Sequence, residues 1–145
     1  MPAPLVTNFG RNVAFRPAAR YNPRSEAEVL DILRAHRGSP VRAVGRLHSW
    51  SDVTVCEGVL LDLRHLDAVT VHADSPDPWI EVGAGCQIKR VIRELQKTGH
   101  ALPSLGLIDE QSVAGATATG THGSGRHSLS HYVRAVRLAG YDPHT

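Results

Sequence analysis

Residues 112–125 read Ser-Val-Ala-Gly-Ala-Thr-Ala-Thr-Gly-Thr-His-Gly-Ser-Gly, and nearly every side chain in this stretch is too small to contribute to a hydrophobic core. Small residues let main-chain N–H groups approach a ligand closely and reach backbone conformations with positive φ. We therefore expect the stretch to hold a phosphate or a pyrophosphate. It contains no Asp or Glu to repel an anion, and it offers the hydroxyl groups of Ser112, Thr117, Thr119, Thr121 and Ser124. A flexible Gly/Ser-type surface loop is the alternative, against which Val113 and the alanines argue.

A second motif lies far upstream and reads Val44-Gly-Arg-Leu-His-Ser-Trp-Ser-Asp52. It predicts the end of a strand followed by a tight turn rich in hydrogen-bond donors. We expect this turn and residues 112–125 to converge on one extended ligand that carries phosphate. His48 stands out, because a neutral imidazole beside an electrophilic ring carbon can form a covalent bond. The alternative for His48 is a hydrogen-bonding role within the turn.

Composition narrows the class of protein. The 145 residues suit one domain, since 41% of them are hydrophobic and 21% are charged. The net charge is +2, and the arginines are scattered, so no nucleic-acid-binding stripe is predicted. No apolar run approaches the roughly 20 residues of a membrane span, and we expect a cytoplasmic protein. The two cysteines, Cys56 and Cys86, lack metal or redox spacing and are expected to be reduced.

A metal-dependent hydrolase that uses His122, His127 and His131 is a further hypothesis. His127 and His131 have the i, i+4 spacing of helical zinc ligands. However, Gly123 and Gly125 disfavour a helix through the first histidine, and no Glu lies between the first two histidines. We therefore predict no metal site and interpret His127 and His131 as surface residues.

The chain is predicted to mix helices and strands. One helix begins after Ser25, where Glu28 completes a capping box, and stops at Gly38. A second helix covers Gln87–Thr98 and ends at Gly99. Strands are expected at Val13–Phe15, Val41–Val44, Val59–Leu63, Ala68–His72, Trp79–Val82 and Arg134–Ala139, the third of these buried on both faces. The polar residues after it are expected to form a solvated face: Asp62, Arg64, His65 and Asp67.

Four short segments carry a resemblance to a known family: Gly45-Arg-Leu-His-Ser49, Ser104-Leu-Gly106, Ser112-Val-Ala-Gly115 and Thr119-Gly-Thr-His-Gly123. Their order and spacing resemble the FAD-binding domain of the vanillyl-alcohol oxidase and p-cresol methylhydroxylase (PCMH-type) superfamily. The similarity is greatest to its sugar-lactone and alditol oxidase branch, which includes gulonolactone and arabinonolactone oxidases. It spans residues 10–140, leaving an N-terminal arm at 1–9 and a tail at 141–145. The resemblance implies an α+β fold with a small-sheet subdomain and a mixed-sheet subdomain flanked by helices, incomplete at the C-terminus.

The resemblance also implies the cofactor, FAD, and the residues around it. The pyrophosphate would lie against two segments, Gly45, Arg46, Leu47, His48, Ser49 and Ser112, Val113, Ala114, Gly115, Ala116. The cofactor would continue along Thr119, Gly120, Thr121, His122 and Gly123, while Ser104 and Gly106 would lie near the isoalloxazine and the substrate. His48 matches the histidine that many relatives attach covalently to the flavin 8α-methyl carbon. His122 matches a histidine near the flavin, with a structural hydrogen-bonding role as the alternative.

Two features depart from the family pattern. Leu47 replaces the usual Gly before the histidine, and a leucine there is expected to crowd the pyrophosphate or to resist positive φ. The second departure is length, since relatives continue for several hundred residues with a substrate-binding cap and C-terminal catalytic residues. We therefore predict no catalytic residue in residues 1–145.

Two functional interpretations follow. The first is the FAD-binding part of an oxidoreductase that oxidises a sugar lactone or alditol, passing hydride to the flavin and then to oxygen or another acceptor. The polyol or lactone substrate would then bind only with a cap domain. The alternative is a non-catalytic FAD- or nucleotide-binding module that needs a partner chain. An incomplete sheet edge would also favour self-association.

Overall fold

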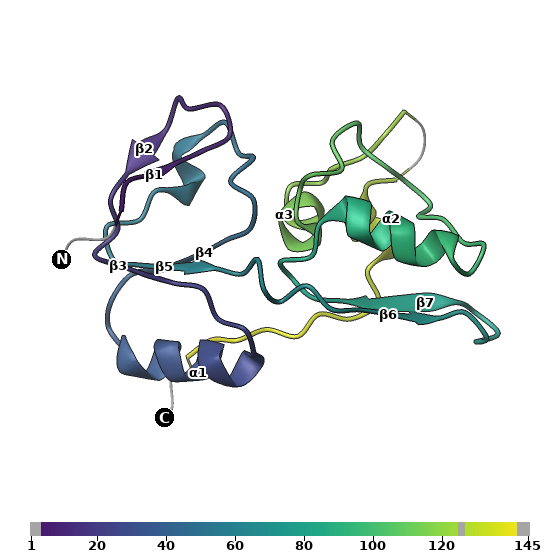
Figure 1. The fold of residues 1–145 in the computed structure, drawn as a ribbon, viewed down its shortest axis with the longest axis horizontal. Coiled ribbons are helices and arrows are strands. Elements are labelled where there is room, and N and C mark those ends of the chain that lie inside the picture. Colours follow the sequence, from purple (N-terminus) through teal and green to yellow (C-terminus); the bar gives the residue numbers. More distant parts are fainter. Residues whose placement is uncertain (1–3, 125–126, 142–145) are drawn as a thin grey trace.

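A three-stranded parallel sheet organises the first half of the chain (Figure 1). The structure is a computed structural model that describes residues 4–124 and 127–141. Its central strand, β5 (Val59–Asp62), lies between β3 (Ala19–Tyr21) and β4 (Val41–Val44). All four residues of β5 are buried, which confirms the prediction of a strand covered on both faces. Residues 1–3 of the predicted arm, Gly125 and residues 142–145 of the predicted tail lie outside the described residues.

Helix α1 (Glu26–Ala35) covers one face of this sheet. The Ser25 hydroxyl accepts the N–H of Glu28 at 3.2 Å, and the Glu28 carboxylate accepts the N–H of Arg24 at 2.7 Å. The Ser25 bond is the predicted N-cap, whereas Glu28 bonds to the N–H of Arg24 and not to the Ser25 N–H that a capping box uses. Gly38 follows the helix with φ +88°. Val29 and Leu33 pack against alternate residues of β5, so the amphipathic pattern seen in the sequence fixes how α1 lies on the sheet.

The opposite face of the sheet is covered by a hairpin of β1 (Val6–Thr7) and β2 (Ala14–Phe15). Val6 and Phe15 pack with Leu60 of β5. The strand expected at Val13–Phe15 is present, whereas β1 and β3 were not predicted. Strands of two or three residues are too short to show an alternating pattern. A short 3₁₀ turn, η1 (Asp52–Thr54), precedes β5.

The second half of the chain forms a separate unit beside the first (Figure 1). Its sheet is an antiparallel pair, β6 (Val69–His72) and β7 (Trp79–Val82), covered by α2 (Ile88–Gln96). Helix α3 (Val113–Ala118) and the 3₁₀ turn η2 (Leu129–Tyr132) pack on the other side of α2. The α+β class is thus confirmed. Where a mixed sheet was expected, the described residues form this two-stranded antiparallel hairpin.

Part of the small-residue stretch is core, which corrects the expectation that its side chains are too small to pack. Ala116 is only 1% exposed and lies between Ile88 and Leu129. A small side chain at this position lets α3 approach α2 closely. After the helix, Gly120 has φ +67°, and the Thr121 N–H bonds to the Ala116 carbonyl at 2.9 Å. This is the hydrogen-bond pattern of a Schellman cap, which favours glycine at that position.

The strand predicted at Arg134–Ala139 is absent from the described structure. Residues 133–141 instead run as an extended strap from the second unit to α1, drawn in yellow in Figure 1. The strap is fastened by side chains: Arg134 pairs with Asp77 at 2.6 Å, Arg137 pairs with Glu26 at 2.6 Å, and the Tyr141 hydroxyl donates to the Leu33 carbonyl at 2.8 Å. No described strand offers it a ladder of backbone partners, so the alternating pattern alone does not make it a strand.

The solvated face expected after β5 is also wrong for Asp62, which is 0% exposed. Because β5 is the central strand, its last residue lies between the neighbouring strands rather than in solvent. The Asp62 carboxylate accepts hydrogen bonds from Arg20 at 2.7 Å and from Arg64 at 2.6 Å. Burial alone would raise the pKa of Asp62, but the hydrogen bonds from Arg64 and Arg20 outweigh burial and lower that pKa.

Candidate functional site

The two motifs found in the sequence meet where the two units adjoin. Gly45 follows β4, and Ser112 precedes α3. A Cβ added to Gly45 would overlap the Ser112 hydroxyl, so the contact requires glycine. The structure therefore brings together two segments that are far apart in the chain.

The first loop, Gly45–Ser49, presents free backbone amides. None of its five N–H groups donates to a residue that the structure describes. Two of its carbonyls face the β1–β2 hairpin: Leu47 O accepts from the Phe9 N–H at 2.8 Å, and Ser49 O accepts from the Asn8 side chain at 2.9 Å. Because C=O and N–H point in opposite directions across a trans peptide, the His48 N–H, which follows the Leu47 carbonyl, points away from the hairpin. Such a row of amides is suited to an anion.

Leu47 lies in the left-handed region, with φ +56°. The expectation that a leucine would resist positive φ is therefore wrong. Its side chain packs against the cluster that contains Val6, Phe15 and Leu60, rather than over the free amides. A left-handed conformation costs a non-glycine residue about 1–2 kcal/mol, which this packing offsets. Leu47 thus adopts a backbone conformation that glycine reaches more readily.

Two buried nitrogens in the same loop have no hydrogen-bond partner among the described residues, Arg46 Nε and His48 Nδ1. An unsatisfied buried donor or acceptor costs about 1–3 kcal/mol, so such groups normally mark a missing partner. The His48 ring also stacks on Phe9, with centroids 4.7 Å apart and planes at 19°. The unpartnered guanidinium nitrogen, the free amides and the glycine contact together fit a phosphate-bearing ligand.

The α3 segment offers fewer donors than the sequence indicated. The N–H groups of Val113 and Ala114 already donate to the carbonyls of Cys86 and Ala84, at 2.8 and 3.3 Å. The Thr117 and Thr119 hydroxyls donate to carbonyls of their own helix, each at 2.9 Å. Of this segment, the Ser112 side chain is the part that lies against Gly45. The first loop therefore supplies most of the free donors.

Of the remaining predicted residues, Gly106, His122 and Gly123 line a hollow of about 480 Å³. Ser104–Leu107 and Thr121–Ser124 lie side by side there, and the Gly123 N–H donates to the Ser104 hydroxyl at 3.4 Å. A Cβ on Gly106 would press on Thr121, and one on Gly123 would overlap the Leu105 carbonyl. His122 lines the hollow, with its Nδ1 2.8 Å from the Gly123 carbonyl. The structure thus groups Ser104, Gly106, His122 and Gly123 as the motifs implied.

Sequence reasoning missed an acidic group close to the first loop. The Glu110 carboxylate accepts from Lys89 Nζ at 2.7 Å and from Gln87 Nε2 at 2.7 Å. The hydrogen bond from Lys89 is the main cause that holds the pKa of Glu110 below its usual value, and the charge of His48 adds a smaller lowering. Glu110 therefore lies within electrostatic range of His48. In the sequence, the one indication of this group is that Glu110 lies two residues before the small-residue stretch.

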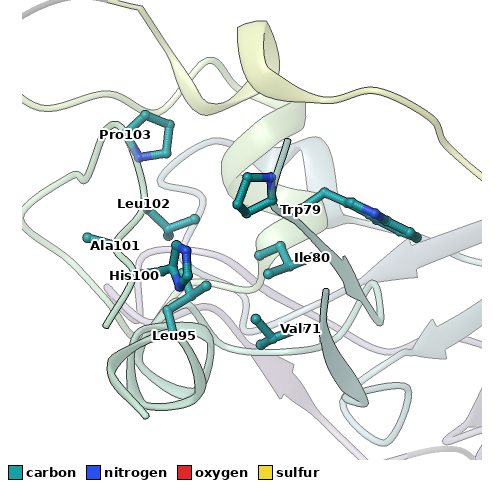
Figure 2. Close-up of a pocket in the computed structure, with 9 residues that line it drawn as sticks. Val71, Trp79, Ile80, Leu95, His100, Ala101, Leu102 and Pro103 are labelled. Carbon is teal, nitrogen blue, oxygen red and sulfur yellow. The ribbon is translucent and has the colours of Figure 1, made fainter. Parts of the chain in front are cut away.

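A second, smaller hollow of about 120 Å³ lies between the β6–β7 hairpin and the turn after α2 (Figure 2). Its walls are mainly apolar, with Val71, Ile80 and Leu95 facing one another and Trp79 and His100 at its sides. None of the residues predicted to hold FAD lines it. We interpret it as a gap in the packing of the second unit.

The histidines of the metal hypothesis show no metal-binding arrangement in the described parts of the chain. His127 and His131 stack on each other, with centroids 3.9 Å apart. No group of three or more potential metal ligands is found in residues 4–124 and 127–141. Over the same residues, no helix is long and apolar enough to cross a membrane.

Residues 17–142 match the family model for the FAD binding domain, and the chain belongs to this family. It is 57% identical over 138 residues to a long-chain alcohol oxidase of an uncultured marine euryarchaeote, covering 95% of this chain and 29% of that protein. It is 36% identical over 138 residues to the L-gulono-1,4-lactone dehydrogenase of Mycobacterium tuberculosis H37Rv, covering 94% of this chain and 32% of that protein. The chain thus spans about a third of the length of these relatives.

The fold is also similar to that of a solved flavoenzyme. The crystal structure of cholesterol oxidase from B. sterolicum superposes with a TM-score of 0.73 at 24% identity, over 86% of this chain and 24% of that chain. This likeness confirms the PCMH-type fold implied by the sequence. The chain is thus an FAD-binding domain, similar in sequence to part of a long-chain alcohol oxidase and part of an L-gulono-1,4-lactone dehydrogenase.

Proposed function

We propose that the FAD pyrophosphate binds where Gly45–Ser49 meets Ser112. The observation that carries this proposal is that the five amides of Gly45–Ser49 and the nearby Arg46 Nε have no partner among the described residues. Backbone N–H groups and a guanidinium are the donors that phosphate oxygens prefer. The isoalloxazine would then extend toward the hollow lined by Gly106, His122 and Gly123.

The protein of which this domain is a part would oxidise a CH–OH group, for which a bound flavin supplies the hydride acceptor. The residues of this chain would bind and orient that flavin. A sugar lactone or an alditol is the first candidate substrate, on the motifs shared with the lactone and alditol enzymes. A long-chain alcohol is the second candidate, favoured by the relative at 57% identity and by the apolar Leu105 and Leu107 at the hollow.

We propose His48 as a covalent attachment point for the flavin 8α-methyl carbon. In that reaction the imidazole N–H and one methyl hydrogen leave with two electrons, which molecular oxygen takes up as hydrogen peroxide, and a carbon–nitrogen bond remains. The unpartnered ring nitrogen of His48 and its place beside the free amides support this role.

The test is an absorbance spectrum of the purified protein with FAD, recorded before and after acid precipitation. Flavin that stays with the precipitate, and is lost in His48→Ala, would support covalent attachment. Flavin that washes free would refute the covalent bond and keep the binding site. Absence of any flavin binding would favour the alternative, a module that needs a partner chain to hold the nucleotide.

The location of the pyrophosphate is tested by two substitutions with a matched control. Gly45→Ala should weaken FAD binding by at least about tenfold, because its Cβ overlaps Ser112 and displaces the loop. Arg46→Ala should weaken it comparably by removing a cationic donor. Gly140→Ala is the control, since a Cβ there meets nothing within 4 Å. Unchanged affinity in both variants, with folding verified by circular dichroism, would refute the proposed location.

A further inference from the structure

The loop of the β1–β2 hairpin is fastened to the back of the first loop. The Asn12 side chain donates to the Trp50 carbonyl at 2.9 Å, in addition to the bonds that Asn8 and Phe9 make to Ser49 and Leu47. Three residues of the hairpin loop thus hold three carbonyls between Leu47 and Trp50. Neither the motifs nor the proposed cofactor contacts include this hairpin.

The hairpin loop is itself rigid. Asn8 is buried, and its side chain also donates to Asn12 Oδ1 at 2.7 Å and accepts the Val13 N–H at 3.0 Å. Gly10 lies directly against the Trp50 ring, leaving no room for a Cβ. A loop braced in this way presents Phe9 in one position.

Phe9 covers one face of the His48 ring. The two rings are nearly parallel, at 19°, with centroids 4.7 Å apart. Phe9 also meets Trp50 edge to face, at 6.1 Å. Within the described residues the imidazole has no hydrogen bond that could fix its rotation, so the stack is the contact that orients it. Phe9 is 60% exposed, so burial of its side chain contributes little stability apart from this stack.

We propose that Asn8, Phe9 and Asn12 form a positioning clamp for His48. Phe9 sets the plane of the imidazole, while the two asparagines hold the backbone that carries it. The inference deepens the proposed function and rests on it, because the clamp would prepare His48 for attachment to the flavin. Phe9 is a positioning residue and touches the histidine rather than the reacting carbon of the flavin.

The first test needs no cofactor. In the FAD-free full chain, the ring protons of His48, assigned with a His48→Gln variant, should be shifted upfield by the Phe9 ring in an NMR spectrum. Phe9→Leu should abolish this shift, and Phe9→Tyr should preserve it. A His48 signal that is the same in Phe9→Leu and in the wild type would overturn the clamp. An equal loss of the shift in Phe9→Tyr would overturn it as well.

The second test separates orientation from affinity. With FAD present, Phe9→Leu should slow covalent retention of flavin by at least about tenfold, since misorienting a reacting group can cost up to about 100-fold. The FAD Kd should stay within about twofold, because the free amides remain in place. Phe9→Tyr should restore the rate. A loss of affinity that accounts for the whole slowing would overturn the inference.

The two proposals fail in different ways. A wild-type protein that retains no flavin after acid precipitation refutes covalent attachment through His48. In that case the NMR comparison of Phe9→Leu with Phe9→Tyr still decides whether Phe9 orients the imidazole. Asn12→Ala provides an independent variant that leaves the stack in place and loosens the loop, and it should broaden the His48 signal without removing its upfield shift.

Discussion

At the scale of single residues, Leu47 combines an unfavourable backbone conformation with a favourable side-chain position. Its φ of +56° belongs to the region that glycine tolerates, yet its side chain belongs to the first core. The two effects oppose each other and can be separated by substitution. The usual ranking of alanine and glycine should therefore be reversed at this position.

We predict that Leu47→Ala is less stable than Leu47→Gly. Both variants lose the packing of the leucine, worth about 1.5–3 kcal/mol when fully buried. Only Leu47→Gly also relieves the left-handed strain, so it should recover about 1 kcal/mol. Urea unfolding of both variants measures the difference. The same pair of substitutions at Leu138, which is exposed on the strap, is the control. A Leu47→Ala variant as stable as Leu47→Gly would contradict the strain argument.

Asp62 predicts a dependence of stability on pH. Its pKa in the folded chain lies below the usual value of 3.8, so its ionised form stabilises the fold above about pH 4. This contribution is lost as the pH falls through the lowered pKa of the folded state. Asp62→Asn should cost about 2–3 kcal/mol at pH 7, because it leaves two arginines without their carboxylate.

The test is the free energy of unfolding measured from pH 7 down to pH 3. The difference in free energy of unfolding between the wild type and Asp62→Asn should become smaller only at the acidic end of this range. Asp31→Asn is the control, since its pair with Arg34 is exposed and should contribute less than about 1 kcal/mol. A gap that is constant down to pH 3 would contradict the assignment.

At the scale of elements, the sequence predicted what periodicity and capping determine. Helices α1 and α2 follow from their apolar stripes and from Gly38 and Gly99, and β5 follows from its run of buried residues. Helix α3 was not predicted, because alanine, threonine and glycine carry no amphipathic signal. The alternation over Arg134–Ala139 predicts a strand, and this prediction is wrong because alternation describes side chains and not backbone partners.

The candidate site, like the fold, could be predicted from the sequence only in part. The meeting of Gly45 with Ser112 could be expected, since a donor-rich turn and a stretch of small residues suit one extended ligand. The stack of Phe9 on His48 and the nearness of Glu110 could not, because both arise from loops that only the folded chain brings together. Contacts between loops produce no periodic pattern in the sequence, so periodicity does not predict them.

The end of α3 provides a prediction at this scale. Gly120→Ala should destabilise the chain by about 1 kcal/mol, because alanine disfavours the left-handed Schellman position. It should also weaken FAD binding, since the residues after Gly120 lead to the hollow. Thermal unfolding and FAD titration measure the two effects, with Gly140→Ala as the matched control. Normal stability and affinity in Gly120→Ala would show that the cap is dispensable.

At the scale of the whole molecule, several backbone edges have no partner in the described structure. The β6–β7 hairpin has only two strands, and the strap carries exposed Val136 and Leu138. Unpaired edges and exposed apolar residues favour association. We predict that the chain self-associates as its concentration rises, and that a Val136→Lys, Leu138→Lys double variant does so less. Sedimentation velocity decides between this and a monomer at all concentrations.

The strap has a further consequence, for proteolysis. Proteases bind their substrates as extended chains, and an exposed segment that, after Val133, has no backbone hydrogen bond within the described residues already has that shape. The strap also contains Arg134 and Arg137, after which trypsin cleaves. Brief trypsin treatment should therefore cut there before it cuts either unit. Arg137 pairs with Glu26 on α1 and also lies close to Glu81 on β7. A cut after Arg137 would therefore also loosen this side-chain link between the two units.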